Sequence, residues 1–259
     1  MVEGRGGEGR KVHLMPYRER DGIGDGCVVK NAKTVLQIPV GEALLGSIVD
    51  AMAQPLDGLG PIQAQAWYSV KGTPSNPFER PRITDKLCLG IKAIDGLNTV
   101  GKGQRMGIFA GSGVGKSTLM GMMAKTAQAD INVIALVGER GREVNEFIER
   151  DLGVEGLKRS IVVVATSDQP AMMRSKCALT ATTIAEYFKD QGKDVFLMMD
   201  SLTRFAMAER EIGLNIGEAP VARGYTPSIY ARLPKLLERA GRFQKGSITG
   251  LYTVLVEGD

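Results

Sequence analysis

The sequence has few of the residues on which metal and disulfide chemistry depend. It contains one histidine, His13, and three cysteines, Cys27, Cys88 and Cys177. An odd number of widely spaced cysteines fits neither a disulfide framework nor a zinc site, and it favours a reducing compartment. The single histidine argues against histidine-based metal sites and against catalytic triads that need a histidine base.

Long apolar runs and concentrated basic charge are also missing. No stretch approaches the ~18 apolar residues of a membrane span, and the glycine-rich, charged N-terminus lacks the apolar core of a secretory signal. The formal net charge is +4, and basic and acidic residues balance over residues 1–80. Without a dense basic stripe, the composition does not call for nucleic acid as a partner.

The pattern of apolar residues differs on the two sides of a linker that is rich in proline and glycine. Residues 1–72 have short apolar runs broken by Gly, Pro and Asp, with strands predicted at 35–40 and 44–49, which is typical of a β-barrel. Residues 73–83 are the predicted linker. From residue 84 onward, apolar runs alternate with amphipathic helices, which indicates an α/β fold with a mainly parallel sheet covered on both faces. The elements predicted there are strands at 106–110, 132–137, 160–165, 194–200 and 247–256, and helices at 116–128, 142–150, 170–189, 203–216 and 227–240.

The strongest chemical signal is a glycine-rich loop between a predicted strand and a predicted helix. Residues 110–117 read AGSGVGKS, which misses the P-loop pattern GxxxxGK[ST] by one methyl group, because Ala110 takes the first glycine position. The glycines allow a tight curl that turns backbone N–H groups toward phosphate oxygens, while Lys116 can reach the β- and γ-phosphates and Ser117 can bind magnesium. We therefore predict binding of a nucleoside triphosphate with Mg²⁺. The predicted nucleotide-binding residues are Gly111, Ser112, Gly113, Val114, Gly115, Lys116, Ser117 and Thr118.

Carboxylates follow two of the predicted strands, at the sheet edge where ligands of α/β proteins bind. Asp200 ends the apolar strand 194–200, and we predict that it binds the magnesium through a water molecule. Glu139 lies just past the strand 132–137, where a carboxylate can orient or deprotonate the attacking water while Arg140 touches the γ-phosphate. The alternatives are that Asp200 only caps the next helix, and that Glu139 and Arg140 belong to a solvated charged turn.

These segments together resemble a known family. The loop 110–117, GERGREV at 138–144 and DSLTR at 200–204 look like the catalytic subunits of the type III protein-export ATPases, which are relatives of the F1 β subunit. ATSDQP at 165–170 and LPKLLERAG at 233–241 are similar to the flagellum-specific branch, whose members also carry alanine at the start of the P-loop.

The resemblance implies a fold, an activity and a set of partners. The fold would be a RecA-like P-loop ATPase core at 84–259, after a partial N-terminal β-barrel. The activity would be ATP hydrolysis coupled to the export of flagellar proteins, with ATP and Mg²⁺ as cofactors. Glu139 would be the catalytic carboxylate, Lys116 and Arg140 would assist it, and Arg204 would lie near the subunit boundary. The implied partners are further copies in a homo-hexamer, a coiled-coil stalk protein in its pore, regulatory and export-gate proteins, and export substrates with their chaperones. The protein would be cytoplasmic and peripheral at the inner face of the cell membrane, through the export apparatus.

Members of this family continue beyond the position of residue 259 into a helical C-terminal domain. The resemblance therefore implies a chain that is truncated at both ends and lacks that domain. The missing part supplies an arginine finger, which is worth about 10³–10⁵ in rate. Slow hydrolysis of ATP by this polypeptide alone is the expectation.

Several other functions compete with flagellar export. A virulence type III secretion ATPase is a close alternative. A rotary ATP synthase β-type subunit fits less well, because Gly141 and the stretch 233–241 match the export branch better. An RNA-translocating helicase would need basic and aromatic residues near its N-terminus, where this chain has one tryptophan, Trp67, and no net charge. A regulatory module that has lost catalysis is disfavoured, because the predicted catalytic residues are all present.

Overall fold

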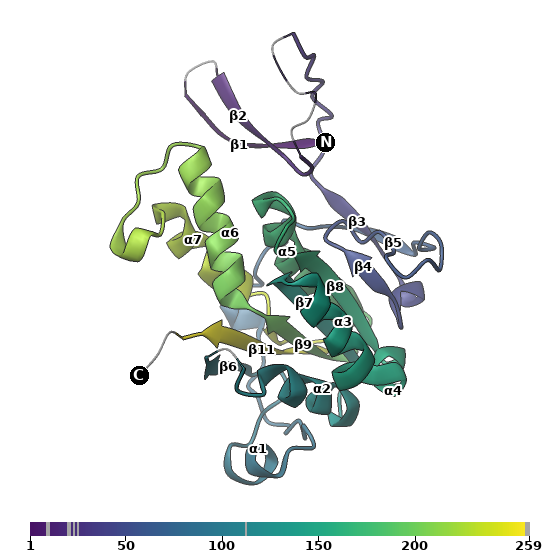
Figure 1. Ribbon diagram of the computed structural model, residues 1–259. Coiled ribbons are helices and arrows are strands. Elements are labelled where there is room, and N and C mark those ends of the chain that lie inside the picture. Colours follow the sequence, from purple (N-terminus) through teal and green to yellow (C-terminus); the bar gives the residue numbers. More distant parts are fainter. Residues whose placement is uncertain (9–10, 20–21, 23, 25, 112, 257–259) are drawn as a thin grey trace.

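The computed structural model describes residues 1–8, 11–19, 22, 24, 26–111 and 113–256. A central sheet of seven strands has helices on both of its faces (Figure 1). The alternating apolar runs and amphipathic helices in the sequence produce this architecture, because strands buried on both faces need helices on each side. The mainly parallel α/β core predicted from that alternation is confirmed.

The strands of the central sheet are β4 (Ile48–Asp50), β6 (Arg105–Ala110), β7 (Ile131–Glu139), β8 (Ser160–Thr166), β9 (Asp194–Asp200), β10 (Gly241–Arg242) and β11 (Ser247–Leu255). Their order across the sheet is β6-β11-β9-β7-β8-β4, and the short β10 pairs with the start of β11. The β10–β11 pairing is antiparallel and the others are parallel. The carboxyl ends of β6, β9 and β7 therefore meet at one edge, which is where the predicted site residues lie.

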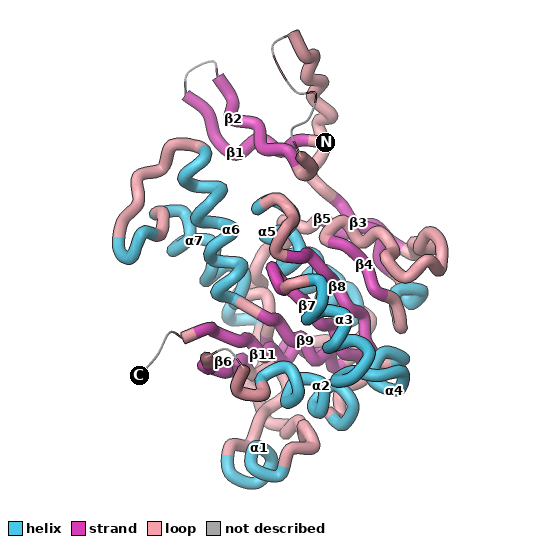
Figure 2. The backbone as a smooth tube through the Cα atoms, in the orientation of Figure 1, coloured by secondary structure: helices cyan, strands magenta, loops and turns pink. Residues whose placement is uncertain are grey.

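The helices are α1 (Lys92–Leu97), α2 (Lys116–Thr126), α3 (Gly141–Glu146), α4 (Gly153–Lys158), α5 (Ala171–Asp190), α6 (Leu202–Asn215) and α7 (Pro227–Leu237), with a π-helical segment at Phe147–Leu152 between α3 and α4. Strand alternation divides the core in two. On β9, Leu197 and Met199 pack with α5 and α6, whereas Phe196 and Met198 pack with α2 on the opposite face. Figure 2 shows the helices α5 and α2 beside the strands of this sheet. No helix in the described part of the chain is long and apolar enough to cross a membrane.

The first part of the chain forms two antiparallel strand pairs. β1 (Val2–Glu8) pairs with β2 (Lys11–Pro16), and β3 (Gln37–Val40) pairs with β5 (Ala66–Ser69). The β1–β2 hairpin was not predicted, since its weak alternation gives little sign of a strand. The strand predicted at 35–40 is present in shortened form as β3.

The strand predicted at 44–49 is wrong in its bounds. A 3-10 helix occupies Glu42–Leu44, and Gly46 turns the chain with a φ of 83° before β4 begins. β4 then pairs in parallel with β8 in the central sheet. The segment before the predicted linker thus contributes a strand to the large sheet, and the division of the chain at 73–83 stays a prediction.

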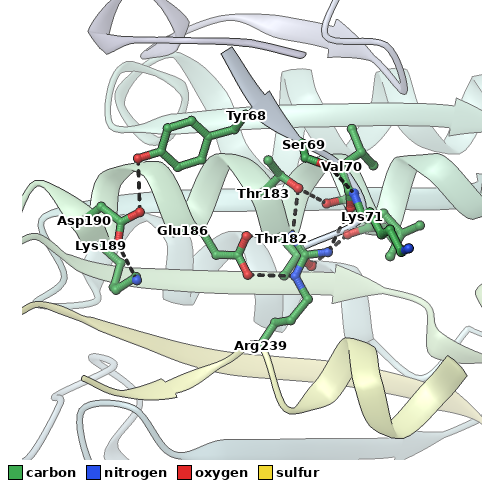
Figure 3. A network of polar contacts seen from close by, with 12 residues as sticks. Tyr68, Ser69, Val70, Lys71, Thr182, Thr183, Glu186, Lys189, Asp190 and Arg239 are labelled. Atoms are coloured by element: carbon green, nitrogen blue, oxygen red, sulfur yellow. Dashed lines mark hydrogen bonds and ion pairs between the residues drawn. The ribbon is translucent and has the colours of Figure 1, made fainter. Parts of the chain in front are cut away.

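A buried arginine attaches β5 to the core (Figure 3). Arg239, which follows α7, donates from Nε and Nη2 to the two carboxylate oxygens of Glu186, both at 2.7 Å. Its Nη1 donates to the carbonyl of Val70 at 3.1 Å. Gly72 packs so tightly against the guanidinium that an added Cβ would lie 2.3 Å from Arg239 Cζ. The residues just before the predicted linker are therefore held against α5 and the segment that follows α7.

Candidate active site

The glycine loop joins β6 to α2 at the carboxyl edge of the sheet. Gly113 and Gly115 have φ angles of 77° and 89°, a backbone conformation that side chains disfavour. The space beside both is open, because a Cβ built on either would have no neighbouring atom within 4 Å. The side chain of Val114 is exposed, and Ser112 lies outside the described residues. This geometry leaves room for a ligand against the backbone of the loop.

The N-terminus of α2 is open to an anion. Gly115 is the N-cap residue, and no side chain among the described residues caps the helix, so within that part of the chain the first-turn N–H groups have no side-chain acceptor. Ser117 lies in this first turn. Thr118, predicted as a nucleotide-binding residue, instead directs its hydroxyl to Asp151 Oδ1 at 3.4 Å. The groups at this point that could bind phosphate are the backbone amides and the side chains of Lys116 and Ser117.

Lys116 and Asp200 form an ion pair between the loop and the central sheet. Lys116 Nζ lies 2.8 Å from Asp200 Oδ1, and the two side chains are 12% and 5% exposed. Asp200 ends β9 on the face that carries Phe196 and Met198, so strand alternation directs its side chain toward α2. The structure thus joins two residues that the sequence singled out separately.

Glu139 reaches the same edge because of an irregularity in β7. The register of β7 with β8 shifts between Val137 and Glu139, and Gly138 between them has a φ of 70°. A Cβ on Gly138 would also lie 3.3 Å from Arg204 Cβ. Both observations favour glycine here, and the shift redirects Glu139 relative to a regular strand.

The surroundings of Glu139 favour its protonated form. Burial, with smaller contributions from the negative charge of Asp200 and a hydrogen bond with Glu143, raises its pKa to about 7. The positive charges of Lys116 and Arg204 oppose this rise. A carboxyl group that titrates near neutral pH is suited to exchange a proton with water, as a general base must.

We expect the Glu139→Gln variant to gain stability over the parent protein as the pH rises from about 4.5 to about 7. In this interval the unfolded carboxyl ionises while the folded one keeps its proton, so raising the pH destabilises the parent alone. The difference should level off above pH 7 at about 1–2 kcal/mol, after allowance for the partial exposure of the carboxyl. Denaturant unfolding of both proteins at several pH values measures it. A difference independent of pH would contradict the raised pKa.

The two predicted arginines lie in different surroundings. Arg204 in the first turn of α6 packs over Gly138, and its buried Nε meets no hydrogen-bond partner among the described residues. Arg140 points outward, with its side chain 75% exposed and its Nη1 3.8 Å from Glu143 Oε1. The structure therefore brings Arg204 to the site and leaves Arg140 at the surface.

One contact at the site was not predicted from the sequence. The hydroxyl of Thr253, near the end of β11, donates to Asp200 Oδ1 at 2.7 Å. A signal for it is present in the sequence, because a threonine stands among apolar residues in a strand predicted to be buried. The identity of its partner depends on strand order, which the sequence does not reveal.

The donor set at this edge suits magnesium that arrives with a nucleotide. The described residues contain no cluster of three or more His, Cys, Asp or Glu side chains that could hold a metal. Mg²⁺ in phosphate sites takes one or two protein oxygens and completes its shell with phosphates and water. The Ser117 hydroxyl can supply such an oxygen, the Asp200 carboxylate can hold a water of the shell, and the uncapped end of α2 and the Arg204 Nε fit the phosphates.

An open glycine loop between a strand and a helix, with an acid at the end of a nearby parallel strand, defines a P-loop nucleotide-binding protein. Residues 90–259 match the model of the ATP synthase alpha/beta family, nucleotide-binding domain. The chain belongs to this family.

Curated relatives of the chain include flagellar and secretion ATPases. The chain is 60% identical over 248 residues to the flagellum-specific ATP synthase of Bacillus subtilis, covering 96% of this chain and 57% of the relative. It is 53% identical over 246 residues to the type 3 secretion system ATPase of Xanthomonas euvesicatoria, covering 95% of this chain and 56% of the relative. The chain thus spans little more than half the length of these relatives.

Solved structures show the same fold. The assembled ATPase EscN of the enteropathogenic E. coli type III secretion system, in complex with its central stalk EscO, superposes with a TM-score of 0.92. It is 49% identical, and the match covers 98% of this chain and 63% of that one. This likeness confirms the RecA-like ATPase core predicted from the sequence.

Proposed function

We propose that the chain is the nucleotide-binding part of an ATPase subunit of the flagellar type III protein-export apparatus. The observation that carries this proposal is the convergence of Lys116, Asp200 and Glu139 beside an open glycine loop. The branch is supported by sequence identity, which is 60% with a flagellum-specific relative and 53% with a type 3 secretion relative. A virulence secretion ATPase is the second candidate, because EscN shares the fold at a TM-score of 0.92.

Each site residue has a part in this proposal. The amides of residues 111–118 and the Lys116 ammonium bind the phosphates, and Ser117 together with Asp200, through water, holds magnesium. Bound Mg²⁺ neutralises charge on the β- and γ-phosphates. Glu139 accepts a proton from the attacking water or orients it. Arg204 is close enough to Glu139 to influence its pKa, which supports a place for it beside the γ-phosphate. Its place near the subunit boundary is proposed from the resemblance alone.

Arg140 needs a change of conformation to act on the nucleotide. Its side chain is 75% exposed, and among the described residues it forms an ion pair with Glu143 alone. A rotation of this side chain toward the loop would bring its charge near the γ-phosphate. We propose this as its catalytic role.

The solved structures of EscN support assembly and a stalk among the proposed partners. EscN has been solved as an assembled ATPase and with its central stalk. We propose that the whole protein assembles into a homo-hexamer around a coiled-coil stalk, and that it meets regulatory proteins, the export gate, and substrates with their chaperones. Its place would be the cytoplasm, peripheral at the inner face of the membrane.

A segment exchange tests the flagellar assignment. We expect motility to persist when this chain replaces the matching segment of the Bacillus subtilis flagellum-specific relative, because 60% identity preserves the core and its contacts. The same exchange into the Xanthomonas secretion ATPase should impair secretion, which a secretion assay measures. ATP hydrolysis by both purified chimeras controls for folding. Active chimeras that support secretion but not swimming would contradict the flagellar branch and favour the virulence alternative.

A further inference from the structure

Thr253 occupies the strand that lies between the glycine loop and Asp200. β11 pairs with β6 on one side and with β9 on the other, and Thr253 is opposite Ile108 of β6. The last paired residues of β11 and β9 are Tyr252 and Met199, so the next residues along are Thr253 and Asp200. The carboxyl end of β11 therefore lies between the glycine loop and Asp200, beneath the proposed nucleotide site.

Strand alternation directs Thr253 toward the same face as Asp200. Leu251 packs in the core on the side of α2, whereas Tyr252 packs on the side of α5. Thr253, two residues after Leu251, therefore points to the α2 side, as Asp200 does two residues after Met198. Its side chain is completely buried. A buried hydroxyl is unfavourable unless it forms a hydrogen bond.

The partner of this hydroxyl is the carboxylate of Asp200. Thr253 Oγ1 lies 2.7 Å from Asp200 Oδ1 and 3.4 Å from the carbonyl oxygen of Met199. The shorter contact is a hydrogen bond to a charged group, and bonds of this kind are the stronger ones. Lys116 Nζ binds the same oxygen at 2.8 Å. Both contacts that Asp200 receives through its side chain from the described residues therefore reach Oδ1.

We propose that Thr253 is a positioning residue that orients Asp200 toward magnesium. The proposal rests on the proposed function, because it requires a magnesium nucleotide at this site. When Lys116 turns to the phosphates, its contact with Asp200 is weakened and the Thr253 hydroxyl keeps Oδ1 in place. The other carboxylate oxygen of Asp200, Oδ2, is then held in one direction and stays available to the magnesium. Partners that orient a metal-binding carboxylate in this way strengthen metal binding without touching the metal.

The test compares residues that differ by one hydroxyl group. Thr253→Val keeps the shape of the side chain and removes the donor, whereas Thr253→Ser keeps the donor. The measured quantity is the Mg²⁺ concentration that gives half-maximal binding of a fluorescent, non-hydrolysable ATP analogue. We expect Thr253→Val to raise this concentration about 10–100-fold and Thr253→Ser to leave it within about threefold of the parent. Binding of the analogue without Mg²⁺ should be the same in all three proteins.

A matched control and a second pair of variants complete the test. Thr182→Val removes another completely buried hydroxyl, which donates to Ala178 within α5 at 2.8 Å, and it should not alter the Mg²⁺ requirement. If Thr253→Val does not fold, Thr253→Ala is compared with Thr253→Ser, since these two differ only by the hydroxyl. An unchanged Mg²⁺ requirement in the folded variant that lacks the hydroxyl overturns the inference. A parent protein that binds no analogue with Mg²⁺ instead overturns the proposed function.

Discussion

Replacing Lys116 by alanine is expected to weaken nucleotide binding and ATP hydrolysis by about 10²–10³-fold each. In the structure Lys116 begins α2 at the open end of the glycine loop, so its ammonium is the cation that can meet phosphates bound there. Titration with a fluorescent ATP analogue and a phosphate-release assay measure the two effects. Lys125→Ala is the matched control, because Lys125 is an exposed lysine in the last turn of the same helix.

The same substitution should also lower stability. Lys116 is the cation beside Asp200, whose side chain is 5% exposed. Removing one partner of a buried ion pair destabilises a protein by about 3–5 kcal/mol, and the open loop places this pair at the lower end of that range. The double variant Lys116→Ala/Asp200→Asn should regain most of the stability but none of the binding. If the single variant is as stable as the parent, the pair does not hold this part of the fold together.

Replacing Glu139 by glutamine is expected to reduce ATP hydrolysis about 10²–10⁴-fold, with nucleotide binding nearly unchanged. Glutamine has the same shape as glutamate but cannot accept the proton of the attacking water. The position is otherwise constrained, because the Gly138 turn directs residue 139 to the sheet edge. Single-turnover hydrolysis with bound ATP separates the chemical step from binding.

Glu146→Gln is the matched control for this change. Glu146 lies in the following helix α3 and forms a surface ion pair with Arg142 at 3.2 Å, so its loss should change the rate little. A Glu139→Gln protein that keeps the parental rate would remove Glu139 from the catalytic role. Loss of ATP binding together with the rate would instead make Glu139 part of the binding site.

The parallel strands of the core could be predicted from the sequence because their signal is local. Each of β7, β8 and β9 is a short apolar run bounded by polar residues, and burial on both faces requires that composition. Helix ends were less well placed. The helix predicted at 142–150 continues through the π-helical segment to Lys158, because Phe147 and Leu152 pack into the core and extend the helical run.

In the segment before the predicted linker, prediction from neighbouring residues gave the wrong strand bounds. The residues from 44 to 49 are apolar enough for a strand, yet the strand β4 begins only at Ile48 and joins the central sheet beside β8. The partner of β4 is β8, more than a hundred positions further along the chain, so a local pattern cannot identify it. Arg239 is similar, since its partners Glu186 and Val70 lie far from it along the chain.

The sequence by itself determined the phosphate-binding loop and the two acids, because a glycine curl, a following lysine and a carboxylate at a strand end are patterns of neighbouring residues. The tertiary structure decided how these groups meet. Strand order places both Lys116 and Thr253 against Asp200 Oδ1, and the Gly138 irregularity directs Glu139 to the same edge, where Arg204 packs over Gly138. These contacts join segments tens of residues apart, and they exist only once the parallel strands have paired in one order and register.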